Sequence, residues 1–205
     1  MVRQGLCVVQ VSDAGSPLIS DPGYKLIRQC REQNVAFTVV PGCCAIICAL
    51  QMSGLPTNRF MFAGFIPNKD KAREDLFKEL AGINTTLVFY ETAPRLLKTL
   101  KVAAEVFGKR EFAVAREITK MYEECKSGMP EDVIAHFEKT PPKGEIVFMV
   151  APPTEVEQPD IDVEKILRQK MQKAPLKTAV KETVEEYKLN KNEVYALAVK
   201  IKNEK

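Results

Sequence analysis

The stretch VVQVSDAGSPLISDPG, residues 8–23, contains the junction that decides the fold. The apolar residues at its start predict a buried strand over residues 7–11, and a helical pattern begins at Tyr24. Between them lies a polar loop in which Gly15 allows the backbone to approach a ligand, while two prolines fix the backbone. Ligands of α/β proteins bind at such junctions, outside the carboxyl ends of strands. The sequence therefore predicts a rigid ligand-binding loop.

The composition of the 205 residues is that of an ordinary globular protein, with 45% hydrophobic and 28% charged residues. The net charge of +3 is compatible with an anionic partner such as RNA but does not require one. No apolar run approaches the roughly 20 residues that a membrane-spanning helix needs. The first residues lead into a strand without the apolar region of a signal peptide. We therefore expect a cytoplasmic protein without a membrane partner.

The six cysteines are expected to be reduced thiols in the protein core, because a chain of this length buries enough apolar surface to fold without disulfides. Cys44 and Cys48 share a helix face, but no CxxC pair accompanies them. The only histidine, His136, is remote from both in the sequence. The pattern therefore predicts no metal site, and we expect His136 to be structural or exposed.

Residues 1–57 alternate between strand and helix patterns. The second predicted strand covers residues 36–40 and the second helix residues 43–53, which is the rhythm of a parallel α/β sheet. Both faces of a parallel sheet must be covered, so two strands are too few for a complete domain. We expect residues 1–57 to be part of an α/β domain that carries the ligand loop.

Residues 58–152 predict a second α/β domain. Short runs of β-branched and aromatic residues predict its strands, and amphipathic stretches predict its helices. The expected strands are residues 60–65, 85–90, 111–116 and 145–150, and the expected helices are residues 69–80, 94–106 and 130–137.

The rest of the chain reads as a linker, residues 153–162, and a helical C-terminal extension, residues 163–205. The extension is somewhat basic and has the outline of a helix–turn–helix. Two interpretations stay open. The extension is a solvated helical cap on the second domain, or its lysines contact nucleic acid.

A series of motifs follows the loop in order along the chain. They are Val40-Pro41-Gly42, Ser53-Gly54-Leu55-Pro56 with Phe60, Phe65-Ile66-Pro67, Phe89-Tyr90-Glu91 with Arg95, Ala115-Arg116-Glu117-Ile118-Thr119-Lys120, Gly144-Glu145, and in the extension Lys177, Ala179 and Val194-Tyr195. Together with the loop, they resemble the bacterial ribosomal RNA small subunit methyltransferase I family, which belongs to the tetrapyrrole methylase superfamily. The resemblance covers essentially the whole chain.

This resemblance implies a fold and a reaction. The fold is two α/β domains of tetrapyrrole-methylase type (class III of the S-adenosylmethionine methyltransferases), with a C-terminal helical extension. The methyl donor is S-adenosylmethionine, held folded between the domains of a homodimer. The reaction is 2′-O-methylation of a cytidine ribose in the decoding region of small-subunit (16S) rRNA, within the 30S subunit. The alternatives are another methyltransferase of the superfamily, or an inactive remnant that binds RNA or the cofactor.

The resemblance also assigns the loop residues a role. Ala14, Gly15, Ser16 and Pro17 correspond to the superfamily's Gly-Asp-Pro loop, which holds the cofactor mainly through backbone groups. Asp13 has two open interpretations, since it either caps its own loop by bonding to backbone N–H groups or positions the cofactor.

Four further cofactor-binding positions lie outside this short motif. Ile19 falls where an apolar residue packs on the cofactor, and Cys44-Ala45 match a small-residue pair that contacts it. Glu91 falls where the second domain supplies an adenine contact.

Two departures from the family pattern limit what can be carried over. Ala93-Pro94 stands where relatives are expected to have a proline and a histidine, so no role of that histidine is transferred. The family also begins with a strand, a loop, helices and another strand that would precede Met1. We therefore expect residues 1–57 to be a truncated first domain, in which residues 7–11 form an exposed edge strand that can pair with another chain.

The sequence does not identify the catalytic base. A ribose hydroxyl is a poor nucleophile until its proton is removed, so a base within hydrogen-bond reach is needed. Glu117 and Lys120 are candidates because they follow a predicted strand, and Arg116 and Lys120 are candidates for binding RNA phosphates. The alternative for Arg116 and Glu117 is a simple ion pair on the domain surface.

Overall fold

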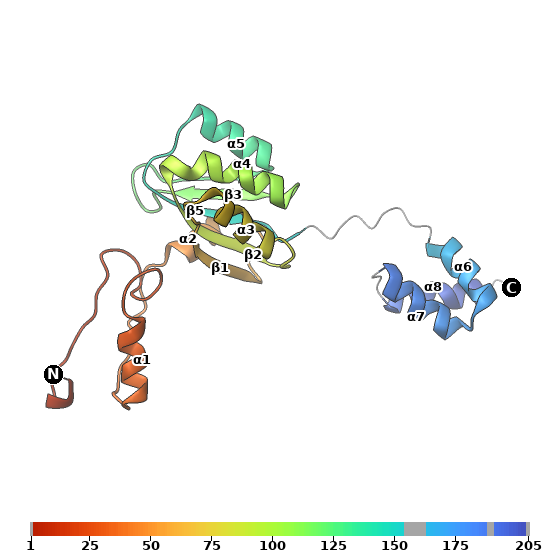
Figure 1. Cartoon of the computed structure of the whole chain (residues 1–205), viewed down its shortest axis with the longest axis horizontal. Coiled ribbons are helices and arrows are strands. Elements are labelled where there is room, and N and C mark those ends of the chain that lie inside the picture. Colours follow the sequence, from red (N-terminus) through yellow and green to blue (C-terminus); the bar gives the residue numbers. More distant parts are fainter. Residues whose placement is uncertain (1, 154–162, 188–190, 204–205) are drawn as a thin grey trace. The chain divides into compact units, whose positions relative to one another are not determined.

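The computed structural model describes residues 2–153, 163–187 and 191–203, and the chain forms two compact units, Met1–Thr154 and Glu155–Lys205 (Figure 1). The elements of the first unit are α1 (Tyr24–Glu32), α2 (Ala45–Ser53), β1 (Phe60–Phe65), α3 (Asp70–Leu80), β2 (Thr86–Thr92), α4 (Leu96–Phe107), β3 (Phe112–Arg116), β4 (Glu124–Gly128), α5 (Pro130–Lys139) and β5 (Glu145–Val150), with short 3-10 helices at Val2–Gln4 and Ala93–Arg95.

The five strands form one mixed sheet with the order β1-β2-β5-β3-β4. β1 and β2 run parallel, whereas β5 lies antiparallel between β2 and β3, and β4 pairs antiparallel with β3. The four strands predicted for the second domain are confirmed, with ends that differ by at most two residues. Because of these directions, β1, β2 and β3 end at the same edge of the sheet at which β5 begins.

Alternate residues of the strands face two separate cores. Leu87 and Phe89 of β2 pack against α3, α4 and α5, where Phe77 and Phe107 surround them. Val88, between them in sequence, faces the opposite side of the sheet, which α2 covers (Figure 1). This period of two is the geometry of a strand buried on both faces. The sheet is therefore fixed from both sides.

Helix α2 precedes the domain boundary that the sequence predicts at residues 57 and 58, but it packs on the sheet that follows this boundary. Ile46, Ala49 and Leu50 are buried against β3 and β5. Gly54 ends the helix in the left-handed conformation (φ 72°), as glycines commonly do. The boundary itself remains a prediction, and α2 holds the preceding loop next to the sheet.

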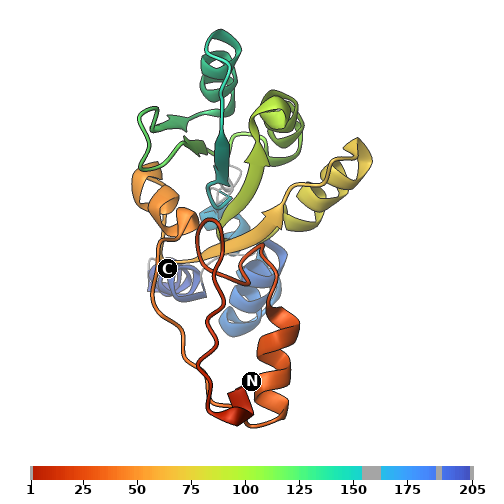
Figure 2. The same cartoon turned by 90° about the vertical axis from the view of Figure 1, so that its left-hand side faces the viewer.

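The strands predicted over residues 7–11 and 36–40 are wrong. Both segments are irregular, and neither pairs with a strand in the described part of the chain (Figure 2). Val11 is 80% exposed and Val40 is 84% exposed, although both are β-branched. A strand forms only when its backbone groups have hydrogen-bond partners and one face of its side chains is covered. These two segments have the apolar, β-branched residues of a strand, but no described strand pairs with them.

The expectation that the cysteines lie in the core is also wrong. All six are free thiols, but Cys7 and Cys43 are exposed and the other four are only partly buried. Cys7 belongs to one of the segments that pair with no described strand, so no sheet covers it there. Cys44 and Cys125 pack at the margin of the core beneath α2.

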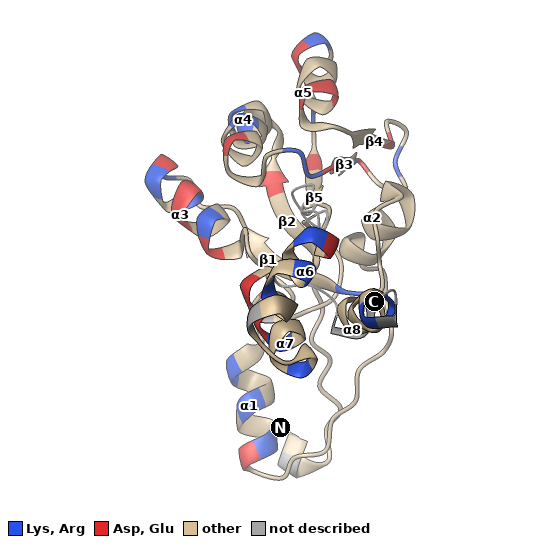
Figure 3. Cartoon of the chain, turned by 90° about the vertical axis from the view of Figure 1, so that its right-hand side faces the viewer, with Lys and Arg blue, Asp and Glu red and all other residues tan. Residues whose placement is uncertain are grey.

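The second unit contains α6 (Val163–Lys173), α7 (Leu176–Tyr187) and α8 (Lys191–Asn203). Their apolar stripes meet around Leu167, Val180, Val194 and Ile201. Residues of both charges occur along these helices (Figure 3), and some of them pair, as Lys170 does with Glu186. The predicted helical extension is present, and both interpretations of its surface stay open. None of the described helices, in either unit, has the length and apolarity of a membrane span.

Candidate functional site

The loop after residue 11 is held by its own polar groups. The Ser12 hydroxyl lies 2.6 Å from the Asp21 carboxylate and 2.8 Å from the Ala14 carbonyl oxygen, and Gln10 donates a hydrogen bond to the Pro22 carbonyl. Asp13 makes no hydrogen bond to the described residues, so it does not cap the loop there, and the side-chain contacts within the loop come from Ser12. The loop is therefore closed by a serine and an aspartate nine residues apart.

Gly15 and the start of α2 bring backbone to the same place. Gly15 has a φ of +71°, and a Cβ there would approach the carbonyl oxygen of Cys43. Cys44 is the N-cap of α2 but its side chain makes no capping hydrogen bond. The first N–H groups of a helix have no partner within the helix. They are available to a ligand beside Cys44 and Ala45.

The edge of the sheet supplies the opposite wall. Phe65 ends β1, and Tyr90 stands near the end of β2, where its ring packs on Phe65 with centroids 5.2 Å apart. Phe62 contacts the same ring at 4.8 Å. The end of β3 and the start of β5 continue this wall, because the directions of the strands place them at the same edge.

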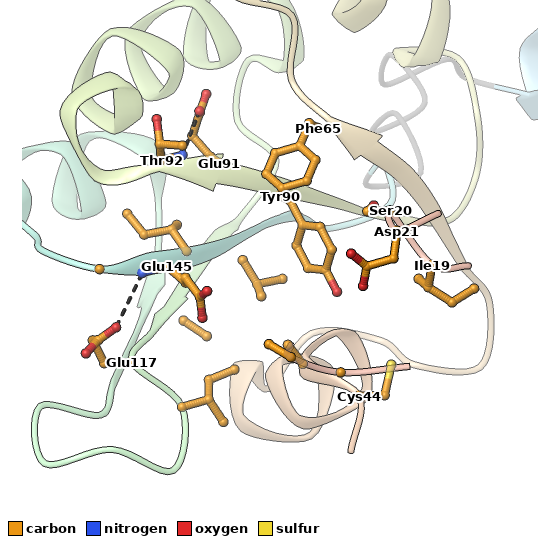
Figure 4. Close-up of a pocket in the computed structure, with 18 of the residues that line it drawn as sticks. Ile19, Ser20, Asp21, Cys44, Phe65, Tyr90, Glu91, Thr92, Glu117 and Glu145 are labelled. Atoms are coloured by element: carbon orange, nitrogen blue, oxygen red, sulfur yellow. Dashed lines mark hydrogen bonds between the residues drawn. The ribbon is translucent and has the colours of Figure 1, made fainter. Parts of the chain in front are cut away.

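Loop, helix and sheet edge enclose a cavity of about 470 Å³ (Figure 4). This is within the usual size range of small-molecule sites. The lining residues are Asp13, Ala14, Gly15, Ser16, Ile19, Ser20 and Asp21 from the loop, Cys44 and Ala45 from the start of α2, Phe65, Tyr90, Glu91 and Thr92 from β1 and β2, Ala115, Glu117 and Ile118 from the end of β3 and the loop after it, and residues 144–147 from the start of β5 and the residue before it. Five of them are Asp or Glu, and none is Lys or Arg.

Glu91 borders the cavity, but its carboxylate points away from it (Figure 4). The side chain is fully buried and accepts hydrogen bonds from the Thr99 hydroxyl at 2.6 Å and the Thr92 N–H at 2.7 Å. Arg95 forms an ion pair with it at 3.2 Å and also donates to the carbonyl of Pro67. The carboxylate thus ties the end of β2 to α4 and to the chain after β1. Glu91 therefore lines the cavity without presenting its carboxylate to it.

Glu117 and Lys120 form a second polar group at the opposite end of the cavity. Glu117 accepts hydrogen bonds from Lys120 Nζ at 3.1 Å and from the Glu145 N–H at 3.3 Å. The hydrogen bond from Lys120 holds the pKa of Glu117 below its usual range, and the same bond raises the pKa of Lys120. Gly144 (φ +83°) leaves the space that Glu117 occupies, since a Cβ there would collide with the carboxylate.

Arg116 pairs with Glu124 at 2.5 Å, so the alternative interpretation of Arg116 and Glu117 as an ion pair is wrong. His136 also contacts Glu124, at 2.6 Å. Burial by itself would raise the pKa of Glu124, but the hydrogen bonds from Arg116 and His136 outweigh it and keep this pKa below its usual value. His136 does not line the cavity, and its contact with Glu124 joins α5 to β4.

The structure brings most of the residues singled out in the sequence to one cavity. Every predicted cofactor-binding residue except Pro17 lines it, and so does the candidate Glu117, whereas Lys120 reaches it only through Glu117 and Glu145. Tyr90 also lines the cavity; it belongs to the Phe89-Tyr90-Glu91 motif but was not among the predicted site residues. The apolar pattern of its strand predicts a core residue at this position. Its place at the end of the strand, where ligands bind in α/β proteins, could have indicated a site residue.

Comparisons with known proteins agree on a family. The family model described as Tetrapyrrole (Corrin/Porphyrin) Methylases matches residues 1–132, and the one described as RsmI C-terminal HTH domain matches residues 157–202. Ribosomal RNA small subunit methyltransferase I of Erythrobacter litoralis is 47% identical over 176 residues, which cover 86% of this chain and 63% of the relative. The protein of the same name from Rickettsia prowazekii is 40% identical over 205 residues, covering 98% and 73%.

The chain therefore spans 63% and 73% of the lengths of these two relatives. Among solved structures, the methyltransferase CobJ superposes with a TM-score of 0.50 at 16% identity, over 67% of this chain and 62% of that one. At this identity the likeness concerns the fold alone.

Proposed function

The chain belongs to the tetrapyrrole methylase family, and within it to the ribosomal RNA small subunit methyltransferase I group, and we propose that it is an S-adenosylmethionine-dependent rRNA methyltransferase. The observation that carries the proposal is the cavity with an acidic lining between the loop of residues 12–21 and the edge of the sheet. The proposed acceptor is the ribose 2′-hydroxyl of a cytidine in the decoding region of 16S rRNA, and the proposed setting is a cytoplasmic homodimer acting on the 30S subunit.

The charges of the cavity support this cofactor over phosphate-bearing ones. S-adenosylmethionine carries a sulfonium and an ammonium group, and a lining with carboxylates favours both. ATP and nicotinamide cofactors carry phosphates, which are bound by Lys, Arg or glycine-rich phosphate loops. Of the described residues that line the cavity, none is Lys or Arg. Ile19, Phe65 and Ile118 supply apolar surface for a nucleoside.

The protein's part in methyl transfer is mainly positioning. When bound, the sulfonium supplies an electrophilic methyl group. The backbone of Ala14, Gly15 and Ser16, with Cys44 and Ala45 opposite, would hold the cofactor in one orientation. An acceptor oxygen must then lie about 3–3.5 Å from the methyl carbon and in line with the bond that breaks.

Glu117 and Lys120 fit an orienting role better than that of a base. A carboxylate with a lowered pKa is a weak proton acceptor, and a lysine with a raised pKa already holds its proton. Their ion pair stands at the rim of the cavity, where Lys120 Nζ also reaches Glu145 at 3.5 Å. We propose that the pair orients the RNA backbone at the cavity entrance.

Two linked measurements test this function. Calorimetry with S-adenosylmethionine should give one site per chain, and labelled methyl should then enter 30S subunits that lack the modification. Mapping should find the label on a ribose 2′-oxygen. Label on a base would contradict the proposed acceptor, and absence of binding would contradict the cofactor.

One observation favours a second candidate, a protein that binds the cofactor or RNA without turnover. The segments before α1 and before α2 pair with no strand in the described part of the chain, so one wall of the cavity rests on local contacts. Calorimetric binding without any methyl incorporation would establish this candidate.

A further inference from the structure

Tyr90 is a hydrogen-bonding group of the cavity that has no role in the proposed function so far. Its hydroxyl points from β2 across the cavity toward the loop, on the side where Asp21 and Cys44 lie (Figure 4). It makes no hydrogen bond to the part of the chain that the structure describes. A phenol hydroxyl that is partly buried normally finds a partner. The position therefore points to a partner supplied by the ligand.

The ring of Tyr90 is held firmly enough to aim this hydroxyl. Phe62 contacts it edge-on with centroids 4.8 Å apart, and Phe65 packs on it at 5.2 Å. The same strand is paired on both sides, with β1 and with β5. Burial, with the nearby Cys44, Glu145 and Asp21, raises the pKa of Tyr90, so the hydroxyl stays protonated and acts as a donor at neutral pH.

The proposed cofactor has one group that the acidic lining does not accommodate. Its sulfonium and ammonium groups suit the carboxylates, but its own carboxylate is repelled by them. No lining residue in the described chain is a lysine or arginine, so this carboxylate needs neutral donors. Ammonium and carboxylate stand on the same carbon atom. An acceptor for the ammonium group and a donor for the carboxylate must therefore lie close together, as the Asp21 carboxylate and the Tyr90 hydroxyl do.

Resting on the proposed function, we propose that Tyr90 and Asp21 together hold the amino-acid end of S-adenosylmethionine. The Tyr90 hydroxyl donates a hydrogen bond to the cofactor's carboxylate, and the Asp21 carboxylate accepts one from its ammonium group. Tyr90 is thus a positioning residue, because fixing this end of the cofactor fixes the direction of the bond to the methyl group.

The test compares Tyr90→Phe with the parent chain, using ligands that differ in the amino-acid end. Phenylalanine keeps the ring that packs on Phe62 and Phe65, so the fold is retained, and an unchanged circular dichroism spectrum checks this. Calorimetry then gives the dissociation constants of S-adenosylmethionine, S-adenosylhomocysteine and decarboxylated S-adenosylmethionine. Tyr122→Phe is the matched control, because Tyr122 is 67% exposed and does not line the cavity.

Tyr90→Phe should weaken the two carboxylate-bearing ligands about tenfold to a hundredfold, the usual effect of a hydrogen bond to a charged group. It should leave decarboxylated S-adenosylmethionine within about twofold of the parent, and Tyr122→Phe should change none of the three. Equal losses for all three ligands would move the contact to the adenosine and overturn the inference, as would no loss. A parent chain that binds none of the ligands would overturn the proposed cofactor as well.

Discussion

The two walls of the cavity are built in different ways. The sheet wall lies at the ends of β2 and β3. The strands behind it are buried, and the residues of β2 from Leu87 to Phe89 are fully so. The loop wall precedes α2, and among the described residues no side chain before Ile46 is buried. Packing holds the first wall, whereas the second is held by hydrogen bonds such as the one from Ser12 to Asp21.

Because of this difference, we expect the sheet wall to determine the stability of the fold and the loop wall to affect mainly ligand binding. Buried apolar surface supplies most of the free energy of folding, and the sheet wall has nearly all of it within the first unit. In the proposed site, the loop wall contributes ligand contacts from a segment without a buried side chain, and binding elements usually belong to such less stable parts of a protein. A ligand that bridges the walls should therefore order the loop far more than the sheet.

The largest expected effect comes from the core of the sheet wall. Phe89→Ala should lower the free energy of unfolding by about 3–5 kcal/mol, because Phe89 is fully buried between α3 and the sheet. Val11→Ala, at an 80% exposed position, should change it by less than about 0.5 kcal/mol. Urea unfolding followed by circular dichroism measures both. A comparable loss of unfolding free energy for Val11→Ala would mean that Val11 is covered in solution. The two walls would then not differ in how they are held.

Next in size is the buried carboxylate that ties β2 to α4. Glu91→Gln should cost about 2–3 kcal/mol, since it removes the charge that Arg95 and Thr99 bind. Glu105→Gln, at an exposed position of the same helix α4, is the control and should be nearly neutral. Urea unfolding measures the stability and calorimetry the cofactor affinity. An unchanged stability for Glu91→Gln would show that the carboxylate does not brace the sheet wall.

A smaller effect is expected where a glycine makes room for Glu117. Gly144→Ala should cost about 1–2 kcal/mol for the left-handed backbone and should displace the Glu117 side chain. Gly82→Ala, in open space and without a positive φ, is the matched control. Thermal unfolding measures the difference between the two variants. Equal unfolding temperatures for the two variants would contradict the claim that the absence of a side chain at Gly144 makes room for Glu117.

The smallest effect concerns pH. Burial opposes ionisation of Glu124, but Arg116 and His136 outweigh it and lower the pKa of this carboxyl in the folded chain, so its ionised form stabilises the fold. This contribution is complete above the ordinary glutamate pKa of 4.5 and is lost as the pH falls through the lower folded value. The parent should exceed Glu124→Gln in stability at pH 7, and the gap should close on acidification below about pH 4.5. A gap that is independent of pH would contradict this.

The sequence predicted the sheet wall well and the loop wall only in part. The strands around Phe62, Phe89 and Phe148 follow from local patterns because each has a neighbouring strand and a helix to cover it. Val9 and Val39 have the same pattern but are 76% and 75% exposed, because a period of two says nothing about whether a partner strand is present.

Most of the residues predicted for the site line one cavity, but the directions of their side chains were not predicted. The loop, with Gly15, and the start of α2 were located from their motifs. The carboxylate of Glu91 turns away from the cavity because Arg95 and Thr99 bind it, and the hydroxyl of Tyr90 turns toward it. Both depend on neighbours brought together by the fold, which a linear pattern does not contain.

Amide hydrogen exchange with and without S-adenosylmethionine tests whether the loop and the sheet edge form one cofactor site. Without the cofactor, residues 12–21 should exchange much faster than residues 86–92. With it, the loop should become strongly protected, together with the start of α2 near Cys44, while the already slow sheet changes little. No change in the loop, or protection confined to the chain around Leu55 and Phe60 beside the other end of α2, would contradict the claim that the loop and the sheet edge form one cofactor site.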